Sequence, residues 1–115
     1  MDGTGMKYNR FEDLPVWQDS AELGRAIFEL TESATFQRHF GLRDQLERAS
    51  LSISNNIAEG FERGTNNELL AFLYIARGSA GEVRSMLRIL ESWKSFADQK
   101  PSIIELRKKT ESISR

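Results

Sequence analysis

Apolar residues recur at steps of three and four over most of this chain, the spacing of one face of an α-helix. They predict four helices, at about 15–31, 42–61, 66–93 and 101–113. Because short connections join them, consecutive helices are expected to run antiparallel. The pattern therefore predicts an all-α fold, an antiparallel up-down-up-down four-helix bundle, as one domain over residues 8–115. Residues 1–7 hold two glycines and no apolar periodicity, and are expected to form a disordered leader.

Local signals mark several helix ends. Asp13 is a candidate cap for the first helix, and Pro15 suits its first turn. Gly60 is a candidate C-cap of the second helix. Thr65 and Glu68 have the spacing of a capping box, which predicts the start of the third helix.

Two connections lack helical periodicity, at 33–41 and 95–100. In the first, Phe36 and Phe40 are expected to pack beneath the loop. His39 lies beside them, so a structural role is favoured over a catalytic one.

The second helix carries many short polar side chains that favour other conformations, namely Ser50, Ser52, Ser54, Asn55 and Asn56. Packing is therefore expected to hold this segment helical. Asn56 falls on the apolar seam, where a buried amide sets helix alignment. Glu59 is either its partner or a rim residue.

The third helix has a wider apolar sector than one seam within a bundle needs. Beside the main seam runs a second line, made of Phe72, Ile75, Ser79, Met86, Ile89 and Trp93. Small residues gather near its middle, namely Ala76, Gly78, Ser79, Ala80 and Gly81. We therefore expect part of this helix to face another subunit, with close approach of a neighbouring helix.

Composition narrows the possible functions. The 115 residues include no cysteine, which excludes disulfides and thiolate metal sites and fits a cytoplasmic location. No apolar run reaches the roughly twenty residues needed to cross a bilayer, so no membrane partner is expected. One histidine and no phosphate-binding or nucleophile motif predict a protein that is not an enzyme and has no metal or cofactor.

Charged residues in the helices offer two candidate features. Arg48 could bridge Asp44 and Glu82 if the second and third helices are antiparallel, and a register-fixing ion pair is favoured over a ligand site. The net charge of −1 gives no overall attraction for nucleic acid, so local patches must supply any binding. The candidates for phosphate contact are Arg77, Arg84, Arg88, Lys108 and Lys109. The alternative is a solvated face crossed by Glu82 and Glu91.

Several segments together resemble the four-helix-bundle family of rRNA intervening-sequence proteins, which includes the accessory variability determinant of diversity-generating retroelements. The matching segments are FEDLPVWQ at 11–18, Leu42, Gln45-Leu46, Arg48-Ala49, Ser52-Ile53, NIAEG at 56–60, Glu68, FLYIA at 72–76, Gly78-Ser79 and Glu82. The resemblance implies a four-helix protomer in a ring-like homopentamer without enzymatic activity. In the retroelement branch it also implies a basic surface that binds nucleic acid and a reverse-transcriptase partner.

The resemblance further implies a structural role for five residues, namely Arg48, Asn56, Glu59, Ser79 and Glu82. Our first hypothesis is a non-enzymatic oligomeric bundle that acts as an RNA- or DNA-associated adaptor. The alternative is a structural scaffold that binds another protein and no nucleic acid.

Overall fold

The computed structural model describes residues 8–114, and the leader expected at 1–7 lies outside them. Within that range the chain is helical and has no strand, which confirms the all-α class. The elements are the short helix η2 (Phe11–Asp13), α1 (Pro15–Leu30), α2 (Ala34–Arg38), α3 (Phe40–Glu62), α4 (Asn66–Glu91), η3 (Lys94–Gln99) and α5 (Lys100–Ile113).

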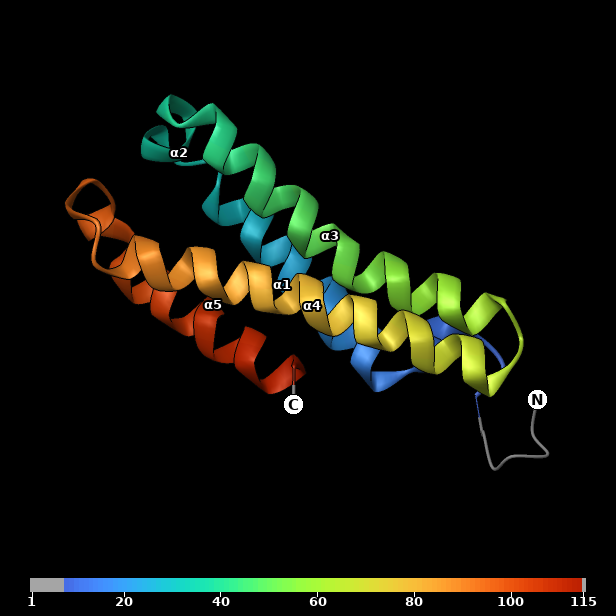
Figure 1. The fold of residues 1–115 in the computed structure, drawn as a ribbon. Coiled ribbons are helices and arrows are strands. Elements are labelled where there is room, and N and C mark those ends of the chain that lie inside the picture. The colour runs from blue at the N-terminus through green and yellow to red at the C-terminus, as the bar shows by residue number, and fades with distance from the viewer. Residues whose placement is uncertain (1–7, 115) are drawn as a thin grey trace.

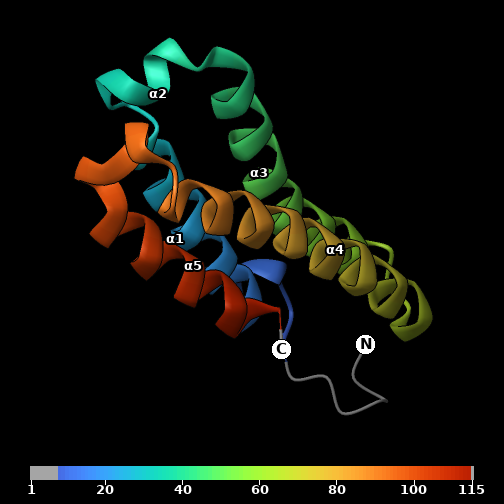
Figure 2. The same ribbon diagram turned by 60° about the vertical axis from the view of Figure 1, so that its left-hand side comes forward.

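The four long helices pack side by side in an elongated body of 52 × 22 × 19 Å (Figures 1 and 2). α3 packs against both α1 and α4, and α5 packs against both α4 and α1. Each helix thus occupies one corner of a four-helix bundle. α3 therefore contributes to two neighbouring sides of the bundle, one formed with α1 and the other with α4.

The core consists of the apolar stripes that the sequence predicts. Leu46 and Ile53 of α3 face Val83 and Leu87 of α4, and all four are at most 1% exposed. Burial of such side chains stabilises the fold by about 1.5–3 kcal/mol each. Packing of these stripes therefore holds α3 helical despite its serines and asparagines.

Aromatic residues close one end of the bundle. Phe36 and Phe96 are fully buried, with ring centroids 4.8 Å apart. The rings of His39 and Trp93 pack on Phe96, with ring centroids at 5.5 Å and 5.3 Å from that of Phe96. His39 therefore contacts aromatic rings of the core. The expectation for Phe40 was wrong, because this residue begins α3 on the solvent side and is 65% exposed.

The helix ends correct two of the expected details and confirm a third. The predicted loop at 33–41 contains the short helix α2, which Ser33 caps by accepting from the Phe36 amide. Asp13 is not the cap of α1, because Leu14 takes that position without a side-chain bond. The Thr65 hydroxyl accepts from the Glu68 amide at 3.2 Å, as expected.

Gly60 is not a C-cap. α3 continues to Glu62, and Gly64 follows its C-cap with φ of +88°, a backbone conformation that favours glycine. The Gly64 amide donates to the Phe61 carbonyl at 3.2 Å, which satisfies an end group of the helix. Gly60 instead lies inside α3 at a close approach of α4, since an added Cβ would be 2.6 Å from the Phe72 Cβ.

Candidate nucleic-acid interface

The predicted phosphate-contact residues divide between two sides of the bundle. Arg77, Arg84 and Arg88 are exposed on α4, and Lys108 is exposed on α5, which packs beside it. These four cations are called the basic seam below. Lys109 lies apart, because its ammonium pairs with Glu22 of α1 at 3.7 Å.

Carboxylates of α4 and α5 neutralise part of the basic seam. Arg84 pairs with Glu111 at 3.6 Å, and Arg88 pairs with Glu91 at 3.4 Å. Beneath them, Arg107 donates to Glu91 and, at 2.8 Å, to Glu111. Arg107 and Glu91 are only 12% and 11% exposed, so this network fastens α5 to α4.

Two cations of the basic seam remain unpaired within residues 8–114. The ion pairs of this range include neither Arg77 nor Lys108. Arg77 lies two turns before Arg84 on the same side of α4. The three arginines therefore form a row along α4, with carboxylates beside Arg84 and Arg88 only.

Acid is expected to weaken the attachment of α5. The Arg107 guanidinium donates to both Glu91 and Glu111 and holds the pKa of each carboxyl below the ordinary value of 4.5, although desolvation opposes this. A lowered pKa in the folded state stabilises the protein above the ordinary value, and that stabilisation is lost as pH falls through the lowered pKa. We expect the melting temperature to fall below pH 4.5 less steeply in Glu91→Gln/Glu111→Gln than in the wild type. Equal slopes in thermal melts would contradict this assignment.

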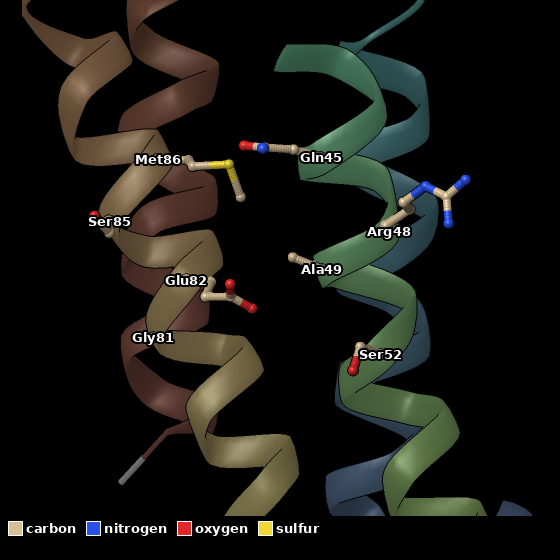
Figure 3. Close-up of a pocket in the computed structure, with 8 residues that line it drawn as sticks. All are labelled: Gln45, Arg48, Ala49, Ser52, Gly81, Glu82, Ser85 and Met86. Carbon is tan, nitrogen blue, oxygen red and sulfur yellow. The ribbon is translucent and has the colours of Figure 1, made fainter. Parts of the chain in front are cut away.

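Arg48 does not bridge the two helices as expected. Its guanidinium pairs with Asp44 at 2.9 Å on the same helix, and its side chain is 79% exposed. A groove of about 690 Å³ separates Arg48 of α3 from Glu82 of α4. Figure 3 shows the Arg48 side chain directed away from Glu82. Both residues line this groove, but their charges do not meet.

Polar contact between α3 and α4 runs through two serines instead. The Ser52 and Ser79 hydroxyls share a hydrogen bond of 2.8 Å. Asn56 is half-buried, and its amide donates to the Ser52 carbonyl and hydroxyl at 2.7 and 2.9 Å. Asn56 therefore orients Ser52 toward α4. Glu59 is a rim residue that pairs with Arg63 at 3.0 Å.

Among the described residues, none of the helices combines the length and the apolar character needed to span a membrane.

Comparison with known proteins identifies the family. No curated protein matches the sequence. The sequence model of one family, described as 23S rRNA-intervening sequence protein, matches residues 12–115, which is nearly the whole chain and includes every residue of the basic seam. The chain belongs to the 23S rRNA-intervening sequence protein family.

Proposed function

We propose that this protein is a non-enzymatic, self-associating helical bundle that binds RNA in the cytoplasm through its basic seam. Membership of a family named after an rRNA element is the observation that carries the proposal. The placement of Arg77 and Lys108 supports it, since unpaired exposed cations release counterions when they meet phosphates. The ring-like homopentamer implied by the resemblance would repeat this seam once in every copy, which raises avidity for a long chain.

A second candidate function is a protein scaffold that binds no nucleic acid. The neutralisation of Arg84 and Arg88 by Glu111 and Glu91 favours it, because paired arginines contribute less to phosphate attraction. The net charge of −1 favours it as well. The two candidates differ in one measurable property, which is salt-dependent binding of RNA.

Removing three positive charges from the seam is expected to weaken RNA binding by about tenfold or more. The variant carries Arg77→Gln, Arg84→Gln and Arg88→Gln together. The slope of log affinity against log salt concentration should shrink by about 2 for a single-stranded RNA, since each lost phosphate contact removes about 0.7. Gel shifts of a labelled RNA over a salt series measure both quantities, and a DNA of the same sequence tests the choice of nucleic acid.

A matched control removes the same charge elsewhere. Arg38, Lys94 and Lys100 are exposed near the aromatic end of the bundle, and their joint replacement by glutamine leaves the seam intact. This control should bind RNA nearly as the wild type does. Absent or salt-insensitive binding by the wild type would remove the proposal and leave the scaffold.

A further inference from the structure

Two neighbouring sides of the bundle expose large apolar side chains. The α3–α4 face carries Ile75 and Ile89, which are 52% and 59% exposed. They share one helical stripe with Glu82 and Met86, which line the groove of Figure 3. The residues of the α3–α4 face used below are Arg48, Ile75, Glu82, Met86 and Ile89.

The second side is the α1–α3 face, which is hollowed by a groove of about 490 Å³. Phe28 and Leu51 line it and are 37% and 43% exposed. Gly24 lies in the same groove, and no atom lies within 4 Å of a Cβ added there. This groove therefore offers space and apolar surface to an approaching helix.

Each face also carries one positive and one negative charge. Arg48 and Glu82 flank the groove of the α3–α4 face. Arg25 and Glu29 lie one turn apart in the α1–α3 groove. Within residues 8–114, no ion pair includes Glu82, Arg25 or Glu29, and Arg48 pairs only with Asp44 on its own helix.

We propose that the α3–α4 face of one copy docks on the α1–α3 face of another copy, with Glu82 opposite Arg25 and Arg48 opposite Glu29. This inference rests on the self-association in the proposed function and specifies its interface. The opposite charges match across the two faces, and the exposed isoleucines meet the groove of Phe28 and Leu51.

Pairing of two different faces also covers more apolar surface than a two-fold pairing of one face. A two-fold dimer through the α3–α4 face alone would leave Phe28 and Leu51 in solvent. Because the same pairing repeats from copy to copy, each copy is related to the next by the same rotation. Such an interface closes into a ring when the rotation fits and otherwise continues as a helical filament.

Charge reversal tests the pairing. Glu82→Arg and Arg25→Glu, each alone, are expected to reduce the mass of the assembly to that of one protomer at low salt, where repulsion is least screened. The double variant carries both changes in every chain and is expected to restore the assembly. Light scattering coupled to size-exclusion chromatography measures the mass, and circular dichroism checks that each variant is folded. Glu105→Arg on α5, exposed and outside both faces, is the control and should assemble as the wild type does.

Each contrary result overturns the inference. A monomeric wild type would do so, as would single variants that keep the mass of the assembly or a double variant that fails to regain it. If Glu82→Arg dissociates the assembly and Arg25→Glu does not, the α3–α4 face pairs with itself. All masses are measured on nuclease-treated protein, so failure here is distinct from failure of RNA binding through the basic seam.

Discussion

Replacing Phe96 with alanine is expected to lower the free energy of unfolding by about 3–5 kcal/mol, the range for a fully buried phenylalanine. Its ring is inaccessible to solvent and contacts those of Phe36, Trp93 and His39. η3, which carries it, connects α4 to α5. The substitution therefore leaves a cavity where three segments of the chain meet, and neighbouring rings cannot collapse into it without separating those segments.

Phe40→Ala provides the matched control, because Phe40 follows His39 directly but is 65% exposed. It loses only a cation–π contact with Arg43, at 5.3 Å, so its effect should stay below about 1 kcal/mol. Urea unfolding followed by circular dichroism measures both variants. Equal losses in the two would show that the aromatic end is not a packed part of the core.

The long helices could be predicted from the sequence because their stripes are regular and their ends carry local signals. Pro15 and the Thr65 hydroxyl are at the starts of α1 and α4 as expected. The connections were less predictable. Phe36 and Phe40 look alike in a segment without periodicity, and only the direction in which α3 begins decides which one is buried. Phe96 is the buried residue of a stretch that reads as polar.

In the candidate sites, spacing along a helix predicts which residues share a face but does not predict which side chains pair with one another. The row of arginines on α4 could be predicted from helical spacing, and all three arginines are exposed on that helix in the structure. The rotation of α5 that brings Glu111 to Arg84 depends on packing between helices, so spacing within α4 could not predict the partial neutralisation. Arg48 and Glu82 line one groove between the antiparallel helices, yet Arg48 is directed to Asp44 one turn away.

Gly60→Ala is expected to destabilise the fold although alanine favours helices. The added Cβ would be 2.6 Å from the Phe72 Cβ and 3.3 Å from the Leu69 Cα, and neither atom can rotate away. α3 and α4 would have to separate, and such overpacking costs about 1–3 kcal/mol. Alanine recovers up to about 1 kcal/mol through helix propensity. With the full recovery of about 1 kcal/mol, the net loss in free energy of unfolding is therefore expected to reach about 2 kcal/mol.

Gly78→Ala separates packing from propensity, because Gly78 lies inside α4 with no atom within 4 Å of an added Cβ. This variant should gain about 0.5–1 kcal/mol, since alanine loses less conformational freedom on folding. Opposite signs for the two glycines in urea unfolding would show that close approach of α3 and α4 requires Gly60. If both substitutions stabilise the protein, the two helices can separate at Gly60 without loss. The serine contact between Ser52 and Ser79, two turns away on α3, would then not depend on that approach.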